Sequence, residues 1–244
     1  MSALPILCYH NVATAPEQAR FKLLYVSPES FERQLWTLRR LGLRGVSASE
    51  GMARLRQAAG RGCVVLTFDD GYADTLTTAA PLIKKYGFSA TCYVVSGAVG
   101  TYNHWDAEYL QEAKSLMSRE QIDQWLAAGM ELGSHSCSHA RLHELPRGAA
   151  QHEIAESRAT LRKMFDVPVE HFAYPFGNFT GETVELVRRA GYVSAVTVLP
   201  GVARTSDDRL RLPRMLVNGD RGWWTFLWQV TSPCERLWRR RRAP

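Results

Sequence analysis

The sequence predicts an α/β domain built around a largely parallel sheet. Short apolar runs alternate along the chain with segments whose apolar residues recur at helical spacing, which is the pattern of strand–helix repeats. With 244 residues, of which 45% are hydrophobic and 22% charged, the chain can bury one large core. No apolar run approaches the roughly 20 residues that a membrane-spanning helix needs. We therefore expect a single globular domain without a transmembrane helix.

The expected strands and helices are located by apolar residues and by the residues that begin and end helices. Pro28 follows Ser27 at the start of one helix, and Gly42 ends it. Ser118 and Gln121 form a capping-box pattern at the start of another. Strands are expected over residues 4–9, 63–68, 88–95, 130–134, 169–174 and 192–198, helices over 28–41, 75–86, 118–129, 150–165 and 183–190, and an irregular segment over 97–114.

Basic residues are concentrated at the C-terminal end of the chain. The formal net charge is +6, and residues 231–244 hold five arginines against one acid, Glu235. A nucleic-acid-binding protein spreads its basic residues over a working face, so that class is disfavoured. We divide the chain into a catalytic domain at 1–220 and a Trp/Arg-rich extension at 221–244. The extension either contacts an anionic membrane surface or forms a final helix whose tryptophans pack on the domain.

The five cysteines are scattered and include no Cys-x-x-Cys pair. This distribution argues against a disulfide framework and against a zinc-finger fold, and it suits a reducing compartment. The first ten residues also lack the basic and apolar stretches of a secretory signal. We therefore expect a cytoplasmic protein, or one that is peripheral at the inner face of the membrane.

Two adjacent carboxylates, Asp69 and Asp70, directly follow the apolar run 63–68. In parallel sheets and barrels, binding sites form at the carboxyl ends of the strands. Neighbouring acids repel each other unless a cation or a proton lies between them, so the pair favours a cation site. The alternative is a solvated turn, because Asp-Asp-Gly is also common in turns.

A pair of histidines, His135 and His139, follows the run 130–134. At this i, i+4 spacing the two rings can point to one side of a helical turn and share a divalent metal. Two histidines and one carboxylate leave coordination positions open for water and substrate, as hydrolytic metal sites require. Each motif alone is weak, but together in one α/β domain they predict a hydrolytic metal site.

The motifs Thr67-Phe-Asp-Asp-Gly71 and His135-Ser-Cys-Ser-His139 resemble those of the polysaccharide deacetylase family, the NodB homology domain or carbohydrate esterase family 4. The resemblance extends from Pro5 to about Val217. Its details are similar to the branch that contains poly-β-1,6-N-acetylglucosamine deacetylases. Further matching motifs are Tyr9-His10-Asn-Val12, Phe172-Ala-Tyr-Pro-Phe-Gly177 and Leu212-Pro-Arg214.

The resemblance implies a distorted (β/α)7 barrel that binds a divalent metal through one aspartate and two histidines. Asp70, His135 and His139 would be the ligands, with zinc as the expected ion and cobalt, nickel or iron as alternatives. Asp69 would be the general base that takes a proton from the attacking water. The backbone N–H of Tyr72 would help to hold the oxyanion of the tetrahedral intermediate.

Two positions depart from the family pattern. Ala173 stands where members often have the arginine that steadies the catalytic aspartate. We expect Arg214 to supply that guanidinium, and the alternative is a surface ion pair. No histidine follows His171, although many members place a general-acid histidine late in the chain. We expect His10 to protonate the leaving amine, or else to be a core or capping residue. His171 itself is expected at a surface or capping position.

Four side chains are expected to bind the substrate. An indole can stack on a pyranose ring, so Trp105 in the irregular segment is a candidate for lining a sugar subsite. Tyr174, Pro175 and Phe176 belong to a motif of the resembling family and are assigned to substrate binding on that ground.

We therefore expect a metal-dependent hydrolase that removes N-acetyl groups from an amino sugar in a bacterial polysaccharide or glycan precursor. The precursor could be a lipid-linked or nucleotide-linked amino sugar. One alternative is a hydrolase that removes a formyl or acetyl group from another such conjugate. The second alternative is a non-catalytic carbohydrate-binding module on a decayed deacetylase scaffold, which Ala173 and the missing late histidine support.

Overall fold

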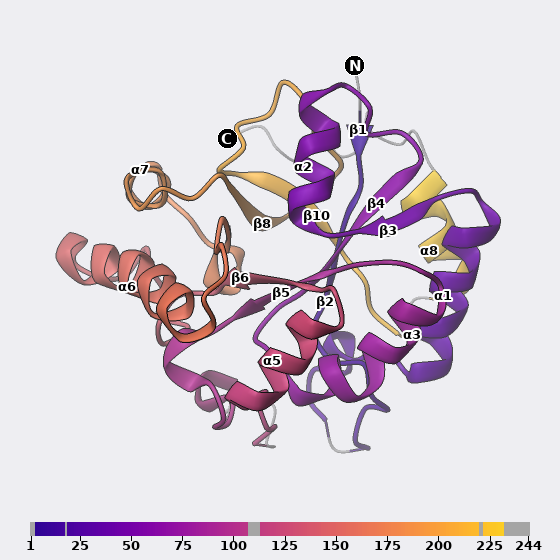
Figure 1. The fold of residues 1–244 in the computed structure, drawn as a ribbon, viewed down its shortest axis with the longest axis horizontal. Helices are drawn as coiled ribbons and strands as arrows, with labels where there is room; N and C mark the ends of the chain where they lie inside the picture. The colour runs from indigo at the N-terminus through magenta and orange to yellow at the C-terminus, as the bar shows by residue number, and fades with distance from the viewer. Residues whose placement is uncertain (1–2, 18, 107–112, 220–221, 232–244) are drawn as a thin grey trace.

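The computed structural model describes residues 3–17, 19–106, 113–219 and 222–231. Within these ranges, seven parallel strands form a closed barrel, which confirms the predicted (β/α)7 fold (Figure 1). In order around the ring, the strands are β2 (Ile6–Tyr9), β4 (Cys63–Phe68), β5 (Thr91–Val94), β6 (Glu131–Ser134), β7 (His171–Ala173), β8 (Ser194–Pro200) and β10 (Leu212–Leu216). The ring closes because β2 pairs with β10 on one side and with β4 on the other.

Among the described residues, three short strands lie outside this ring. β3 (Arg44–Val46) pairs with the first half of β4. β1 (Ala3–Leu4) and β9 (Ala203–Arg204) form a separate antiparallel pair. The predicted strand 4–9 is therefore divided at Pro5, whose nitrogen cannot donate a ladder hydrogen bond.

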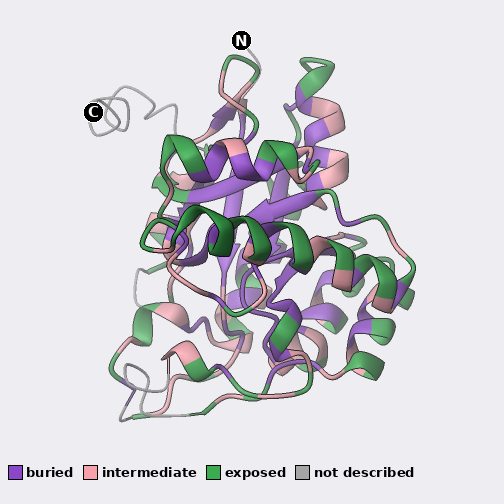
Figure 2. Ribbon diagram, turned by 90° about the vertical axis from the view of Figure 1, so that its left-hand side faces the viewer, coloured by how far each residue is buried: buried purple, intermediate pink, exposed green. Residues whose placement is uncertain are grey.

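Helices cover the outside of the barrel, so that the strands are buried and the outer helix faces are exposed (Figure 2). The helices are α1 (Pro28–Arg40), α2 (Ala48–Arg56), α3 (Ala80–Lys85), α5 (Arg119–Ala127), α6 (Arg147–Phe165), α7 (Gly181–Arg189) and α8 (Trp223–Thr231). A π-helical turn, η2 (Thr75–Ala79), leads into α3, and 3-10 turns occur at η1 (Lys22–Leu24), η3 (Ser96–Ala98), η4 (His104–Asp106) and η5 (Pro175–Gly177).

Helix starts follow the capping residues in the sequence. α1 begins at Pro28, and the Ser27 hydroxyl accepts a hydrogen bond from the Ser30 N–H. α5 begins with the predicted capping box, in which the side chains of Ser118 and Gln121 each accept the other residue's backbone N–H. These side chains satisfy N–H groups that have no partner within the helix.

Side chains along the strands alternate between the barrel interior and the layer beneath the helices. Along β4, Val65 packs in the inner apolar cluster, whereas Val64 and Leu66 pack in the outer cluster. Successive side chains of a strand point to opposite faces. Thr67 and Asp69 therefore continue the inward-pointing series of Val65 toward the carboxyl end of the barrel.

The amino end of the barrel is closed by a buried polar network around His171. Its Nδ1 lies 2.8 Å from the Ser194 hydroxyl and its Nε2 lies 2.9 Å from the Ser49 hydroxyl. The Glu131 carboxylate accepts hydrogen bonds from the Ser49 hydroxyl and backbone N–H and from the Thr91 hydroxyl. The expectation of a surface or capping position for His171 is wrong, because only 1% of the residue is exposed.

Helix α8 packs on α1, which agrees in part with the predicted final helix: of its described tryptophans, Trp223 contacts the domain, whereas Trp224 and Trp228 are exposed. The Trp223 indole donates a hydrogen bond to the Thr37 hydroxyl at 3.0 Å, and Phe226 is buried. Trp224 and Trp228, four residues apart, are 73% and 40% exposed. Residues 232–244 lie outside the described residues, so their contact with a membrane stays a prediction. None of the described helices combines the length and apolar character needed to cross a bilayer.

Candidate active site

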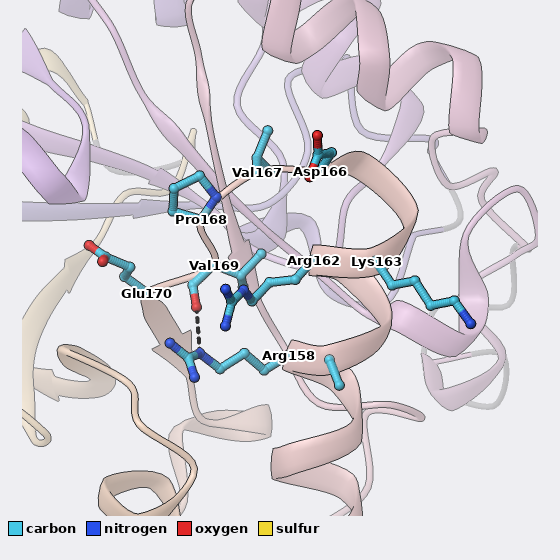
Figure 3. Close-up of a pocket in the computed structure, with 9 residues that line it drawn as sticks. Arg158, Arg162, Lys163, Asp166, Val167, Pro168, Val169 and Glu170 are labelled. Atoms are coloured by element: carbon cyan, nitrogen blue, oxygen red, sulfur yellow. Dashed lines mark hydrogen bonds between the residues drawn. The ribbon is translucent and has the colours of Figure 1, made fainter.

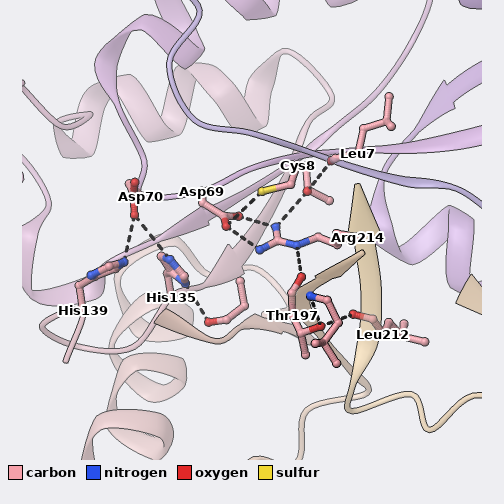
Figure 4. Close-up of polar contacts among 12 residues, drawn as sticks. Leu7, Cys8, Asp69, Asp70, His135, His139, Thr197, Leu212 and Arg214 are labelled. Carbon is pink, nitrogen blue, oxygen red and sulfur yellow. Dashed lines mark hydrogen bonds and ion pairs between the residues drawn. The ribbon is translucent and has the colours of Figure 1, made fainter. Parts of the chain in front are cut away.

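Asp69 and Asp70 follow β4 at the carboxyl end of the barrel and face different partners (Figure 4). Asp70 has a φ of 73° and Gly71 a φ of 84°, so the chain turns sharply through two left-handed residues. A Cβ atom on Gly71 would lie 3.2 Å from a methyl group of Val94, which leaves little room for a side chain. This turn separates the two neighbouring carboxylates.

Asp70, His135 and His139 meet in one buried cluster. Asp70 Oδ1 lies 3.5 Å from His135 Nε2 and 3.3 Å from His139 Nε2. One donor atom from each residue lies within 4.8 Å of the other two. All three side chains are buried. The structure therefore brings together the three residues that were predicted to bind a metal, and we call them the triad.

The prediction that the two histidines share a helical turn is wrong. Residues 135–139, the histidine loop, are neither helix nor strand. Ser136 and His139 have left-handed φ values of 65° and 59°. The Ser136 hydroxyl accepts a hydrogen bond from the His139 N–H at 3.0 Å, which folds the loop back on itself. This loop, rather than helical spacing, brings both imidazoles to Asp70.

Two neighbouring elements hold the histidine loop in place. Glu153, on α6, accepts hydrogen bonds from the backbone N–H groups of Cys137 and Ser138 and from the Ser138 hydroxyl. The Gly97 N–H donates to the Cys137 carbonyl at 2.8 Å. A Cβ atom on Gly97 would lie 2.7 Å from that oxygen, so the close approach of the two loops requires glycine.

The atoms of the triad that could coordinate a cation face one another without forming hydrogen bonds between them. Asp70 Oδ1 is buried and, although it faces both Nε2 atoms, it forms no hydrogen bond with a described residue. His135 Nδ1 lies 2.8 Å from the Ala173 carbonyl oxygen, which can only accept. His135 Nδ1 therefore carries the proton, and Nε2 presents a lone pair to Asp70.

Charge and spacing in the triad also fit a small divalent metal. Burial, with a smaller effect from His139, lowers the pKa of His135 to about 4, so the ring is neutral, as a ligand must be. Two ligands that are each about 2.0–2.1 Å from a tetrahedral zinc ion lie roughly 3.3–3.4 Å apart. The separations of 3.5 and 3.3 Å between the triad atoms are close to that value.

Asp69 forms a buried ion pair with Arg214 of β10. Nη1 and Nη2 of Arg214 donate to Oδ1 and Oδ2 of Asp69, both at 2.6 Å. Arg214 also donates to the Thr67 hydroxyl and the Thr197 carbonyl, and only 1% of it is exposed. The expected guanidinium contact is confirmed, and the alternative of a surface ion pair is wrong. Although burial raises the pKa of Asp69, Arg214 holds it well below its usual range, so the carboxylate is ionised.

Cys8 and His10, at the end of β2, also lie beside Asp69. The Cys8 thiol donates to Asp69 Oδ2 at 3.5 Å, and a ring nitrogen of His10 lies within 4.8 Å of both groups. His10 Nδ1 is buried and has no hydrogen-bond partner among the described residues. Cys8 was not predicted, but its spacing of two residues from His10 on a strand signals that both side chains share a face.

Trp105 and Phe176 flank His139 on the outer side of the triad. The Trp105 ring stacks on the imidazole with centroids 4.6 Å apart, and the Phe176 ring meets it at 4.5 Å in an edge contact. Both side chains are partly exposed. Tyr174 and Pro175 are buried, and the Tyr174 hydroxyl donates to a backbone carbonyl at 2.8 Å. Of the four predicted substrate-binding side chains, Trp105 and Phe176 thus have surface beside the triad.

Tyr72 lies next to the triad in the turn that follows β4. No described residue accepts a hydrogen bond from its backbone N–H, so this group is free for the predicted oxyanion role. Its buried hydroxyl donates to Asp106 Oδ2 at 3.3 Å. Asp106 was not predicted to be a site residue, and the only sequence feature that points to it is its position directly after Trp105.

A hollow of about 630 Å³ lies between the end of α6 and the start of β7 (Figure 3). Arg158, which lines this hollow, donates hydrogen bonds to the carbonyl of Val169, before β7, and to the carbonyl of Ala190, at the end of α7. Because β7 begins at this hollow and the triad lies beyond the other end of the strand, the hollow is not part of the site.

Sequence comparisons relate the chain to known deacetylases. A family model described as polysaccharide deacetylase matches residues 56–195. YxkH of Bacillus subtilis (strain 168) is 29% identical over 217 residues, which cover 88% of this chain and 71% of that protein. A poly-β-1,6-N-acetyl-D-glucosamine N-deacetylase of Staphylococcus epidermidis is 25% identical over 169 residues. That match covers 64% of this chain and 55% of the staphylococcal enzyme, so this chain spans about half its length.

Solved structures with the same fold include two that match nearly the whole chain. The Streptococcus pyogenes deacetylase PplD, determined in complex with acetate, aligns with a TM-score of 0.81 and 26% identity, covering 93% of this chain and 97% of PplD. IcaB from Ammonifex degensii aligns with a TM-score of 0.80 and 27% identity, covering 94% and 97% of the two chains.

Proposed function

The chain belongs to the polysaccharide deacetylase family, and we propose that it removes N-acetyl groups from an amino sugar of a bacterial polysaccharide by metal-dependent hydrolysis. Its relatives indicate a carbohydrate deacetylase. One observation carries the more specific proposal. Asp70, His135 and His139 converge on one point, while the adjacent Asp69 is outside this ligand cluster and pairs with Arg214. This arrangement provides three metal ligands and a separate base.

The triad would hold the metal, with zinc favoured and cobalt, nickel or iron as alternatives for the same ligands. A cation bound there would polarise the acetyl carbonyl and lower the pKa of a water molecule. His135 and His139 contribute neutral nitrogen donors, and Asp70 contributes the negative charge. The hydrogen bond from His135 Nδ1 to the Ala173 carbonyl fixes the orientation of that ring.

Asp69 accepts a proton from the attacking water in this proposal. Its two contacts with Arg214 keep the carboxylate ionised and fix its plane. The Thr67 hydroxyl accepts from Arg214 and donates to the Leu7 carbonyl, which ties the ion pair to the barrel wall. The base is therefore held in position before any substrate binds.

His10 and Tyr72 complete the proposed proton transfer and charge stabilisation. His10 lies beside Asp69 and has an unpartnered Nδ1, so it can deliver a proton to the leaving amine. The Tyr72 N–H can donate to the oxyanion that forms when the carbonyl carbon is attacked. The amide C–N bond then breaks, which releases acetate and the free amino sugar.

The substrate that we propose is β-1,6-linked N-acetylglucosamine, because the staphylococcal relative is named for it. Lipid-linked and nucleotide-linked amino sugars gain no support from these relatives. The non-catalytic carbohydrate-binding module also loses one of its two supports, because Arg214 provides the guanidinium that Ala173 cannot.

The test is acetate release by zinc-reconstituted protein from β-1,6-linked N-acetylglucosamine oligomers, with β-1,4-linked oligomers for comparison. We expect release that stops when zinc is chelated and returns when zinc is added. In Asp69→Asn, release is expected to fall by about 10²–10⁴-fold while zinc is retained. N-formyl oligomers assayed for formate distinguish a deformylase. Oligomer binding without acetate or formate release, unchanged by chelation, would overturn the proposal in favour of a binding module.

A further inference from the structure

Asp106 is a carboxylate at the edge of the site that has no part in the proposed hydrolysis. It lies in η4 directly after Trp105, whose ring stacks on His139. Its Oδ2 accepts a hydrogen bond from the Tyr72 hydroxyl, whereas no described residue donates to its Oδ1. The residue is partly exposed. Asp106 therefore offers one oxygen with a known partner and one that can accept from a ligand.

A buried chain of hydrogen bonds holds Asp106 in this orientation. Asn103 Nδ2 donates to the Tyr72 hydroxyl oxygen at 3.3 Å, so the hydroxyl proton of Tyr72 points to Asp106 Oδ2. Asn103 is fully buried, and its Oδ1 accepts the Lys114 N–H at 2.6 Å. Each amide and hydroxyl in this chain has a defined direction, which leaves Asp106 Oδ1 as the acceptor at its end.

The electrostatic surroundings of Asp106 are those of the metal site. Burial and the charge of Asp70 raise the pKa of Asp106, while His139, His10 and the Tyr72 hydrogen bond lower it. The triad, His10 and Asp106 are therefore close enough to influence one another. A sugar with its N-acetyl group at the triad would have its ring near Trp105 and Asp106.

We propose that Asp106 is a substrate-binding residue whose Oδ1 accepts a hydrogen bond from a hydroxyl group of the amino sugar. A pyranose ring presents an apolar C–H face and a rim of hydroxyl donors. The indole of Trp105 and the adjacent carboxylate match these two features. This inference rests on the proposed function, and it assigns a polar contact for the sugar ring.

The variant Asp106→Asn separates substrate binding from a purely structural role. The amide keeps a carbonyl oxygen that can accept from Tyr72, and it places an NH₂ donor where Oδ1 accepts in the parent. The hydrogen bond with the Tyr72 hydroxyl is thus retained, while the acceptor for the sugar hydroxyl is lost. Asp123→Asn, the same chemical change at an exposed position on α5, is the matched control.

Binding is measured by calorimetry with zinc-loaded protein that carries Asp69→Asn, so that the N-acetylglucosamine oligomer is not consumed. Adding Asp106→Asn is expected to weaken binding about tenfold, because a hydrogen bond to a charged group is lost. Adding Asp123→Asn should leave the affinity unchanged. In otherwise unmodified enzyme, Asp106→Asn should raise KM about tenfold and change kcat less than twofold, with parent-like zinc content and Tm.

Unchanged affinity in the variant with Asp106→Asn would overturn the inference, as would the absence of oligomer binding to the Asp69→Asn protein. A lower kcat accompanied by loss of zinc or a lower Tm would show that Asp106 has a structural role, and it would overturn the inference as well. The proposed function is judged separately by acetate release from the parent. If the parent and Asp106→Asn both release acetate with equal KM, the proposed function stands and this inference fails.

Discussion

The two ends of the barrel both bury histidines beside carboxylates, but they differ in how the polar atoms are satisfied. At the amino end, both ring nitrogens of His171 contact serine hydroxyls at 2.8 and 2.9 Å. Glu131 accepts hydrogen bonds from two hydroxyls and one backbone N–H. At the carboxyl end, Asp70 Oδ1 and His139 Nδ1 are buried without a hydrogen-bond partner among the described residues.

This difference distinguishes a structural network from a binding site. A buried polar atom without a partner costs about 1–3 kcal/mol, so a fold that only needed stability would pair it. The amino end is paired in this way and closes the barrel. At the carboxyl end, one ligand atom each from Asp70, His135 and His139 instead faces a common point, and the non-glycine left-handed residues Asp70, Ser136 and His139 lie there too.

The largest expected loss of stability follows the removal of the buried guanidinium at the carboxyl end. Arg214→Met leaves Asp69 ionised and unpaired in the barrel, which should lower the free energy of unfolding by about 3–5 kcal/mol. Acetate release should be abolished as well. Urea denaturation measures the first effect. Arg211→Met, at a half-exposed arginine paired with Asp208, is the control and should change little. Parent-like stability of Arg214→Met would contradict the described ion pair.

The next expected effect concerns the support of the histidine loop. Glu153→Ala removes the acceptor for three hydrogen bonds of that loop without touching a triad residue. Such supporting changes typically weaken metal affinity about 10–100-fold, which competition with a chelator of known zinc affinity measures. Glu156→Ala, an exposed glutamate on the same helix, should leave the affinity unchanged. Equal effects of the two variants would show that Glu153 does not position the loop.

At the amino end the comparison predicts a stability effect without a functional one. His171→Gln should lower the free energy of unfolding by about 1–3 kcal/mol, because Ser49 or Ser194 loses its partner. Zinc content and kcat should stay at parent values. Loss of zinc in this variant would indicate that the two ends are coupled and that the distinction between them fails.

The smallest effect is a pH dependence of stability at the same histidine. Burial lowers the pKa of His171, with Glu131 and Glu170 opposing that shift and Arg56 adding to it. Below the unfolded pKa of about 6.5, the unfolded chain binds a proton that the folded state resists, so stability falls as the pH is lowered through this value. The difference in unfolding free energy between parent and His171→Gln should therefore shrink from pH 7.5 to pH 5.5. A difference that is constant with pH would refute the assignment.

The sequence predicted those parts of the site that follow strands directly. Asp69 and Asp70 end an apolar run, and His135 ends another, so the parallel-strand rule places them at one mouth of the barrel. Arg214 was anticipated from its strand-end motif. The burial of its side chain could not be predicted, because it depends on how β10 pairs with β2 and β8.

Other features arise from contacts that local sequence does not encode. Helical spacing suggested a turn for His135 and His139, but the loop conformation is set by Glu153 and Gly97 from other elements. The strand β3 and the helix α2 were missed because residues 44–56 contain no long apolar run. Tyr174 was assigned to substrate binding from a motif, whereas packing buries its side chain.

The central claim is that the triad binds one catalytic metal ion, and elemental analysis of zinc-reconstituted protein together with acetate release tests it most directly. We predict about one zinc ion per chain in the parent and in Asp69→Asn, and almost none in Asp70→Ala. Acetate release should be full in the parent, about 10²–10⁴-fold lower in Asp69→Asn and absent in Asp70→Ala. Full zinc content in Asp70→Ala, or acetate release that persists in it, would contradict the account.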